Sequence, residues 1–417
     1  MLTLAPVVPG LGSLNNKRVQ RSMPPQSGVS THHHLVNLSP EELWMTWTSL
    51  AQHSTSIGPS PIAMMTKDER TSRFLARIAL QLDMLRDADA AGKRAEELVL
   101  SLEEIAHVRA RWEDIVLRGE QQLHVLASNL AEDLLQTENI QRVARVVAGP
   151  KEEIETAASR IVIEEFISPS QLAETTDYRL AAEIARRYLY RPHGEEDFSV
   201  LYPRASFLEF RPLELGNGSV ATRVITRVKA NDAIWNKVTD ALFDVDSVIS
   251  RDKILNAKSK YVKDVFGIKV LVGLPHDCYR VESRLDELEV PLHTTDRTDL
   301  RNREPLELIE QKDYLRRDGQ KKQTGWEALK NVYRWGQHYF EVQIQTEANY
   351  FAEISDLSST SHRTFEMQRR HLRWELETIL PHYRDFRHLL RGIFDTRTEF
   401  AHLERLGVDL EWVTLVA

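Results

Sequence analysis

Apolar residues recur at helical spacing along the first half of the chain after residue 65. Residues 66–69 (TKDE) form a capping-box pattern, which predicts the start of a helix. Residues 101–104 (SLEE) form a second capping box, and the apolar spacing after it persists toward Val147. A further amphipathic helix is predicted over residues 169–190, ending before a proline. The pattern therefore predicts that residues 66–190 are helical throughout.

The pattern changes after residue 192. Residues 220–228 (VATRVITRV) and 262–272 (VKDVFGIKVLV) are rich in β-branched residues, and residues 339–344 (YFEVQI) alternate apolar with polar positions, as strands do. Helices are predicted between these strands, over residues 234–243 and 278–288. We therefore expect an α+β protein with a mixed β-sheet domain, flanked by helices and preceded by an all-helical region.

These patterns predict four parts of the chain. A length of 417 residues is typical of two or three domains. The first part is rich in Ser, Pro, Gly and Thr and is predicted to be a flexible leader. The predicted parts are a leader (1–65), a helical domain (66–192), the mixed sheet domain (193–366) and a C-terminal helical segment (367–417).

Composition narrows the class of protein. Cys278 is the single cysteine, which excludes an internal disulfide and a cysteine zinc cluster, and we expect it to be a small buried residue on a helix. A reducing, cytoplasmic location fits this usage best. The net charge of -8 argues against a nucleic-acid coat. No apolar run reaches the length needed to cross a bilayer, so no membrane partner is expected.

Two acidic residues occupy positions on predicted strands that suit a metal. Asp264 lies at the start of one strand, and Glu341 opens another, with Gln343 on the same face two residues later. Carboxylates from neighbouring strands can hold Mg²⁺ beside nucleotide phosphates, because Mg²⁺ takes few carboxylates together with phosphate oxygens and water. The structural alternative is that each acid is a solvated surface residue.

Cations cluster around these acids in the sequence. Arg227, Lys229 and Lys237 occur within eleven residues (RVKANDAIWNK), and further basic residues follow up to Lys269. Cations are the expected partners of a triphosphate, since they neutralise charge during phosphoryl transfer. A solvated basic face is the alternative. The density of basic residues alone does not distinguish such a face from a triphosphate-binding site.

The motifs occur in an order that resembles the synthetase domains of the RelA/SpoT family. The segments, in order, are RVKANDAIWNK, VKDVFGIKVLV, DCYRV, KDYLRRDGQKKQTGWEALKNVY, FEVQIQT and the pair Ala352-Glu353. The corresponding family pattern runs R-x-K-x-x-x-S-I-x-x-K, D-x-x-G-I-R, D-x-Y, K-D-Y-I, N-G-Y-x-S-L-H and E-x-Q-I-R-T. Each motif is weak by itself, whereas the shared order and spacing are specific.

The resemblance implies a GTP pyrophosphokinase with a nucleotidyltransferase-like sheet domain. Such a transferase moves the β,γ-pyrophosphate of ATP to the 3′-hydroxyl of GDP or GTP, giving (p)ppGpp, the signal of the stringent response. It implies that Asp264 holds Mg²⁺, that Glu341 assists the metal or helps to deprotonate the attacking hydroxyl, and that Gln343 positions this hydroxyl. The implied ATP-binding residues are Arg227, Lys229, Lys237 and Lys269, and the implied acceptor-binding residues are Tyr314, Lys322, Trp326 and Lys330.

The chain departs from the family pattern mostly on the acceptor side. Trp326 stands where the family has a tyrosine, and a large aromatic ring can still stack on a purine. The other replacements are Ala233 for serine, Lys269 for arginine, Thr324 for asparagine, Ala328 for serine, Lys330 for histidine and Gln345 for arginine. Metal-site and strand elements therefore match better than the acceptor site does.

Two other functions stay open at this point. The altered segment TGWEALK and the lysines before it favour a toxin-like relative that pyrophosphorylates tRNA or an adenine nucleotide. The replacements also suit a degenerate module that binds a nucleotide or a regulatory partner without catalysis, although such a module would have no reason to keep both carboxylates. The helical regions are expected to serve regulation or a homo-oligomer.

Overall fold

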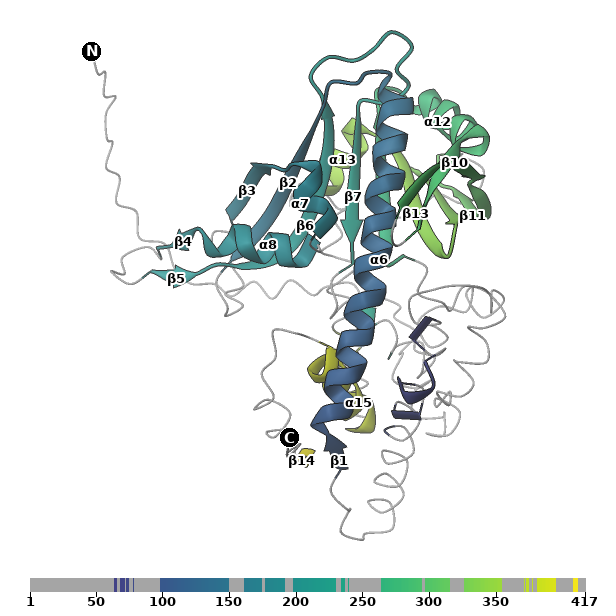
Figure 1. Ribbon diagram of the computed structural model, residues 1–417. Coiled ribbons are helices and arrows are strands. Elements are labelled where there is room, and N and C mark those ends of the chain that lie inside the picture. Colours follow the sequence, from purple (N-terminus) through teal and green to yellow (C-terminus); the bar gives the residue numbers. More distant parts are fainter. Residues whose placement is uncertain are drawn as a thin grey trace, which may run out of the picture.

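The computed structural model describes a large part of the chain (Figure 1). The described residues are 64–65, 68–71, 73–74, 78, 98–149, 161–174, 177–191, 198–229, 234–236, 239, 264–294, 297–315, 326–354, 371, 373–374, 377, 381–394 and 408–411. The predicted leader lies outside them apart from residues 64–65, so its flexibility stays a prediction. No described helix is both long enough and apolar enough to span a membrane.

An eight-stranded mixed sheet forms the centre of the molecule, with the strand order β11-β12-β13-β8-β7-β6-β2-β3. Strands β13 and β8 run parallel, and the other neighbours in the sheet are antiparallel. This arrangement confirms the predicted α+β class. The strands are β2 (Ile140–Gly149), β3 (Ile161–Phe166), β6 (Tyr202–Pro212), β7 (Arg223–Val228), β8 (Phe266–Val272), β11 (Glu307–Asp313), β12 (Leu329–Trp335) and β13 (His338–Thr346).

Three short strand pairs and several helices surround this sheet. The pairs are β1 (Leu98–Ser101) with β14 (Val408–Glu411), β4 (Leu189–Tyr190) with β5 (Ser199–Val200), and β9 (Glu289–Thr294) with β10 (Arg297–Pro305). The helices are α6 (Leu102–Leu135), α7 (Pro169–Glu174), α8 (Asp177–Arg186), α12 (Pro275–Glu287), α13 (Glu347–Ile354) and α15 (Pro381–Phe394).

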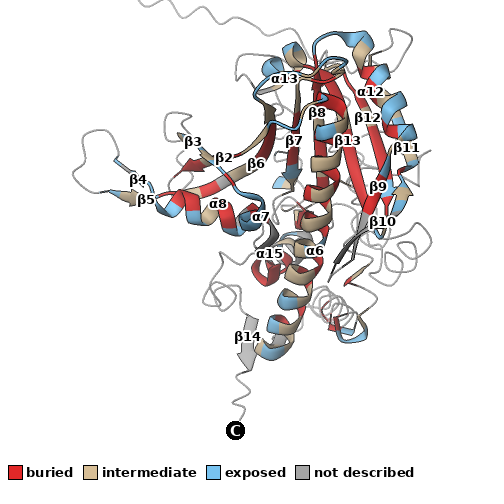
Figure 2. Ribbon diagram, turned by 45° about the horizontal axis from the view of Figure 1, so that its top comes forward, coloured by how far each residue is buried: buried red, intermediate tan, exposed pale blue. Residues whose placement is uncertain are grey.

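The helices divide unequally between the two faces of the sheet. In Figure 1, α6 and α8 lie in front of the sheet and α13 lies behind it. Phe266, Ile268 and Val270 of β8 point to the front face and join the main core cluster together with residues of α6, α8 and α12. Figure 2 shows the central strands as largely buried. Ile225, Leu271 and Tyr350 form a second, smaller cluster under α13.

Helix α6 begins where the sequence predicts and ends earlier than expected. The Ser101 side chain accepts a hydrogen bond from the Glu104 amide at 3.4 Å, so the residue caps the helix. At the other end, Gln136 adopts the left-handed conformation with φ 51°. The expected continuation of the helix toward Val147 is therefore wrong. Residues 140–149 instead form β2, because their β-branched side chains fit a strand that pairs with β3 and β6 on its two sides.

The predicted helix over residues 169–190 is also corrected. It is divided into α7 and α8, and Tyr190 belongs to the short strand β4. Since β2 and β3 lie in the same sheet as β7 and β8, residues 66–190 are not helical throughout. The boundaries of the four predicted parts stay predictions.

Cys278 is buried on α12, as expected from the sequence. Burial raises the pKa of its thiol to about 12.

Gly119 lets α6 approach the middle of the sheet closely. A Cβ atom at this position would lie 2.0 Å from Cζ of Phe266, whose side chain is fully buried in β8. We expect Gly119→Ala to destabilise the protein by about 1–3 kcal/mol, because the ring has to move in a packed core. Urea unfolding measures this change. In a Phe266→Leu background, Gly119→Ala should lower the free energy of unfolding by less. A Gly119→Ala protein more stable than wild type would contradict the close contact between Gly119 and Phe266.

Candidate functional site

The strand register places the predicted site residues on one face of the sheet. Arg227, Gly267 and Glu341 are paired across β7, β8 and β13, and in the next row Lys269 is paired with Gln343. Lys330 of β12 continues this second row. Paired residues of neighbouring strands project to the same face. These side chains therefore share the face opposite to α6, which is the face that carries α13.

Glu341 is at the centre of a short polar chain on this face. Its Oε2 lies 2.5 Å from Nζ of Lys330, and Gln343 Nε2 donates to its Oε1 at 2.6 Å. Glu341 is 7% exposed and lies inside β13, so the expectation that it opens the strand is wrong. Gln343 lies on the same face two residues later, as predicted. Both oxygens of the carboxylate are thus held in defined positions.

Lys330 is held as a cation by its surroundings. Burial by itself would lower the pKa of this ammonium group, but the charge of Glu341 and the hydrogen bond to it raise the pKa above its ordinary value. Asp264 and Tyr314 act in the same direction. Lys330 therefore brings a fixed positive charge to the side of Glu341, at a position where burial alone would favour a neutral amine.

Lys269 and Glu353 form a second pair beside the first. Nζ of Lys269 lies 2.8 Å and 2.7 Å from the two carboxylate oxygens of Glu353, and Gln345 donates to the same carboxylate at 3.1 Å. Burial is the largest influence on Lys269 and lowers its pKa, whereas the pKa of Glu353 falls because Lys269 outweighs burial. We assign both groups as charged, because the ammonium contacts both oxygens at hydrogen-bond distance.

A third pair lies where β7 ends and β8 begins. Nζ of Lys229 donates to Oδ2 of Asp264 at 2.7 Å, and the Lys229 amide donates to the Val265 carbonyl at 2.9 Å. Lys229 directly follows β7, and Asp264 lies two residues before β8, so neither is inside a strand. The expectation that β8 begins at Asp264 is therefore corrected, and the acid lies in the segment that leads into this strand.

An aromatic pair borders the site. The rings of Tyr314 and Trp326 lie 5.5 Å apart between centroids and are tilted by 59°. The side chain of Trp326 also hydrogen-bonds to Glu353, which helps to lower the pKa of that carboxyl. Tyr350 contributes a third ring from α13, 5.4 Å from Nζ of Lys269. Flat aromatic surfaces thus lie next to the paired charges.

Gly267 leaves room between Arg227 and Glu341. Among the described residues, a Cβ atom on this glycine would have two neighbours within 4 Å, the backbone oxygens of Arg227 at 3.6 Å and Glu341 at 3.9 Å. No described side chain of the adjacent strands therefore comes within 4 Å of a Cβ atom at Gly267. A glycine inside a strand often marks a place where a ligand approaches the backbone.

The structure brings most of the predicted site residues to one region and adds one residue. Lys237 and Lys322 lie outside the described residues. Glu353 pairs with Lys269, although sequence reasoning assigned it no role; its signal was its place in the motif order. The predicted residues that gather on or beside this face are Arg227, Lys229, Asp264, Lys269, Tyr314, Trp326, Lys330, Glu341 and Gln343.

The donor atoms at the site suit magnesium. Asp264 and Glu341 both raise the pKa of Lys330 by their negative charge, and Asp264 itself is paired with Lys229. Two carboxylates match what Mg²⁺ takes from a protein when phosphate oxygens and water supply its other ligands. Among the described residues, no group of three or more His, Cys, Asp or Glu is arranged to hold a metal ion.

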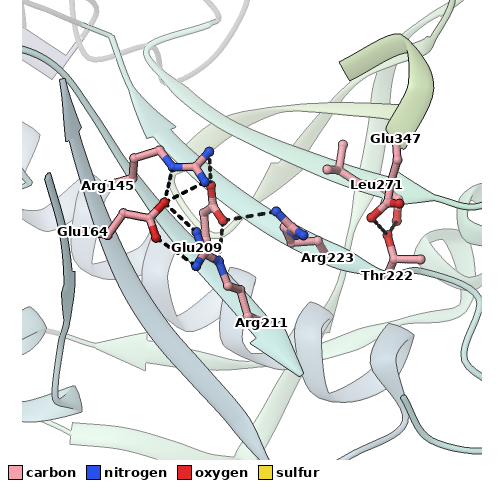
Figure 3. A network of polar contacts seen from close by, with 8 residues as sticks. All are labelled: Arg145, Glu164, Glu209, Arg211, Thr222, Arg223, Leu271 and Glu347. Carbon is pink, nitrogen blue, oxygen red and sulfur yellow. Dashed lines mark hydrogen bonds and ion pairs between the residues drawn. The ribbon is translucent and has the colours of Figure 1, made fainter. Parts of the chain in front are cut away.

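A separate ion-pair network lies on the same face of the sheet (Figure 3). It lies next to the small apolar cluster of Ile225, Leu271 and Tyr350. The carboxylate of Glu209 is fully buried and lies 2.7 Å from Arg145, 2.7 Å from Arg211 and 3.5 Å from Arg223. Glu164 pairs with Arg145 at 2.7 Å and with Arg211 at 3.0 Å. Because each arginine already contacts a carboxylate, the network joins β2, β3, β6 and β7 rather than forming a vacant anion site.

This network predicts a loss of stability in acid. The hydrogen bond from Arg211 is the main reason that the pKa of Glu164 falls from its ordinary 4.5 to about 2. A carboxyl with a lowered pKa in the folded state stabilises the protein above its unfolded pKa and loses that effect as the pH falls. The stability difference between wild type and Glu164→Gln should therefore shrink between pH 4.5 and pH 2. Urea midpoints measure it, and a constant difference would contradict the assignment.

A comparison with protein families agrees with the motif order. The family described as "Region found in RelA / SpoT proteins" matches residues 226–360. A search of curated proteins finds no match. Among solved structures, small alarmone synthetase 1 from Bacillus subtilis bound to its product pppGpp is 17% identical, with 45% of this chain and 81% of that chain covered and a TM-score of 0.22. A GTP pyrophosphokinase family protein from Streptococcus pneumoniae is 16% identical, with coverages of 45% and 80% and a TM-score of 0.23.

The fold and the charged face place this protein among α+β proteins with a polar site on one side of a mixed sheet. The part of the chain that carries this site is the part that the family matches, since β7, β8, β12, β13 and α13 all lie within or overlap residues 226–360. Residues 226–360 match the RelA/SpoT family, and their altered motifs make this match a divergent one.

Proposed function

We propose that the protein is a magnesium-dependent pyrophosphokinase that transfers the β,γ-pyrophosphate of ATP to the 3′-hydroxyl of GDP or GTP, forming (p)ppGpp in the cytoplasm. One observation carries the proposal: within the family-matched segment, Glu341 is fixed between Lys330 and Gln343 on the face that also carries Lys269. A buried carboxylate held between a cation and an amide is suited to accept a proton from an attacking hydroxyl.

The proposed ATP-binding side of the site consists of cations that can leave a carboxylate partner and bind a phosphate instead. Lys229 and Lys269 are paired with Asp264 and Glu353, and Arg227 lies on the same face. A triphosphate offers these cations oxygens of higher charge than a carboxylate does, which makes charge-assisted hydrogen bonds to phosphate favourable. In the proposed complex they neutralise the β- and γ-phosphates, while Lys237 adds a further cation from the same motif.

The transfer step balances as follows. The 3′-oxygen of the acceptor attacks the β-phosphorus of ATP, the bond from that phosphorus to the oxygen bridging it to the α-phosphate breaks, and AMP leaves. The proton of the hydroxyl passes to a carboxylate oxygen of Glu341, which Gln343 orients. Magnesium, held by Asp264 and Glu341, would supply charge neutralisation for the phosphates. Positioning and charge account for most of the catalysis expected in this class of reaction.

The acceptor side is assigned to the aromatic pair and its neighbours. Trp326 offers a ring for stacking on a guanine base, and Tyr314 lies beside it. Lys330 lies 2.5 Å from Glu341, the proposed general base. It is therefore close enough to the reacting hydroxyl to contact the acceptor as well. Lys322 is proposed to bind the acceptor's phosphates, from the segment between these two aromatic residues in the sequence.

Transfer of label from γ-³²P-ATP in the presence of Mg²⁺ tests the proposal. GDP, GTP, ATP and bulk tRNA are offered as separate acceptors, and the products are separated by chromatography. Label on a guanine nucleotide is the expected result. Label on tRNA or on an adenine nucleotide would replace the proposed acceptor. Nucleotide binding without any transfer would contradict the proposed activity and favour a non-catalytic module.

A further inference from the structure

Three buried aromatic residues from distant parts of the chain meet next to the predicted ATP-binding motif. The rings of Trp235 and Phe394 are stacked, with centroids 3.7 Å apart and planes 9° apart. Trp112 of α6 packs edge-on against both, at 5.2 Å and 6.2 Å. Each of the three side chains is at most 2% exposed. The cluster therefore joins α6, the motif segment and the end of α15 through close packing.

The end of α15 is also attached to α6 by hydrogen bonds. Arg109 donates to the carbonyl of Gly392 at 2.6 Å and to the carbonyl of Ile393. The last carbonyls of a helix have no partner within the helix, so a cation placed there satisfies them and interacts favourably with the helix dipole. This contact fixes the position of Phe394, the last residue of α15, relative to α6.

Trp235 belongs to the motif that contains the predicted ATP-binding cations. It follows Arg227 and Lys229 in the sequence, and Lys237 comes two positions later. Trp235 and Ile234 are buried, and the hydroxyl of Thr239 donates to the Trp235 carbonyl at 2.9 Å, as in a helical turn. The sheet holds Arg227 through β7. The described contacts of Ile234 and Trp235 are instead with the core to which Phe394 belongs.

We propose that Phe394 is a positioning residue for the ATP-binding motif, so that affinity for ATP depends on a C-terminal helix outside the family-matched segment. The identity of the nucleotide rests on the proposed function. Without the ring of Phe394, Trp235 loses its stacked partner and faces a cavity. The chain that follows Arg227 and Lys229 then loses a buried anchor, and the motif is less well ordered for binding the triphosphate.

The proposal is tested on the full chain with Phe394→Ala and two companion variants. Phe394→Tyr keeps a ring that can stack. Ile184→Ala removes an equally buried side chain from α8, which packs on another part of the sheet, and serves as the control for a general loss of stability. The measurements are amide hydrogen exchange in peptides covering residues 230–240, and the dissociation constants of a non-hydrolysable ATP analogue and of GDP. All are made below the unfolding temperature of each variant.

We expect Phe394→Ala to speed exchange in these peptides and to weaken binding of the ATP analogue at least about tenfold, with GDP binding little changed. Phe394→Tyr should restore both values, and Ile184→Ala should change neither. If Phe394→Ala does not fold, Phe394→Leu replaces it, since leucine keeps bulk without the stack. Unchanged exchange and unchanged affinity in a folded variant would overturn the proposal. Faster exchange in a protein that binds no ATP would instead refute the proposed function and leave the positioning role.

Discussion

Glu341→Gln is expected to lower pyrophosphate transfer at least about 100-fold, because an amide cannot take the proton of the attacking hydroxyl. The substitution keeps the shape of the side chain, and an amide oxygen can still accept a hydrogen bond from Lys330, which now lies 2.5 Å from Oε2. The loss should therefore fall mainly on kcat, and any rise in the KM for ATP would report the share of Glu341 in holding Mg²⁺. Initial rates with labelled ATP over a range of concentrations measure both quantities.

Glu307→Gln is the matched control for this prediction. Glu307 also lies on a strand of the same sheet and pairs with a cation, Arg334, but at the edge strand and with an exposed side chain. Its substitution should leave transfer within about twofold of wild type, as surface ion pairs contribute little. A Glu341→Gln protein that is folded and retains most of its kcat would remove Glu341 from the proposed proton transfer.

Gly267→Val is expected to reduce binding of the ATP analogue at least about tenfold while the protein stays folded. The valine side chain would occupy the open position between Arg227 and Glu341, where the proposed phosphates lie. Its Cβ meets backbone oxygens at ordinary contact distances, and a β-branched residue suits a strand. Stability should therefore be kept or raised. Isothermal titration calorimetry and urea unfolding measure the two effects.

Two further glycine variants make this prediction specific. Gly267→Ala adds a single carbon at the same place and should have a smaller effect on affinity. Gly273→Val adds the same side chain just beyond the end of β8, where a Cβ would have no neighbour within 4 Å in the described part of the chain, and should leave binding unchanged. Undiminished affinity in folded Gly267→Val would mean that ATP does not approach the sheet at this position.

The ion pairs of three lysines in the candidate site bear on the predictions for Glu341→Gln and Gly267→Val. Lys229, Lys269 and Lys330 are each bonded to a carboxylate in the structure. Each of these three positive charges is thus neutralised by a carboxylate before a nucleotide arrives, and each cation is held where burial alone would be costly. The replacement of the family's histidine by Lys330 and of its arginine by Lys269 fits this scheme, since a lysine is a compact charge that one carboxylate can pair.

The sequence by itself determined the local features of the site. The β-branched run before Val272 and the alternation around Glu341 predict β8 and β13, because strand preference there agrees with burial. The capping box at Ser101 gives the start of α6, since the cap is a contact within one turn. The motif order identified the residues that gather on the face of the sheet. All of these depend on neighbours in the sequence.

Only the tertiary structure decided which distant segments meet. Residues 140–149 have helical spacing yet form β2, because strands on both sides supply partners that the sequence around them does not reveal. Glu353 joins the candidate site through Lys269, and Phe394 contacts the proposed ATP-binding motif through Trp235. Such contacts depend on how helices and strands pack over long separations, so short-range patterns determine the elements of this protein, whereas packing determines how they form one site.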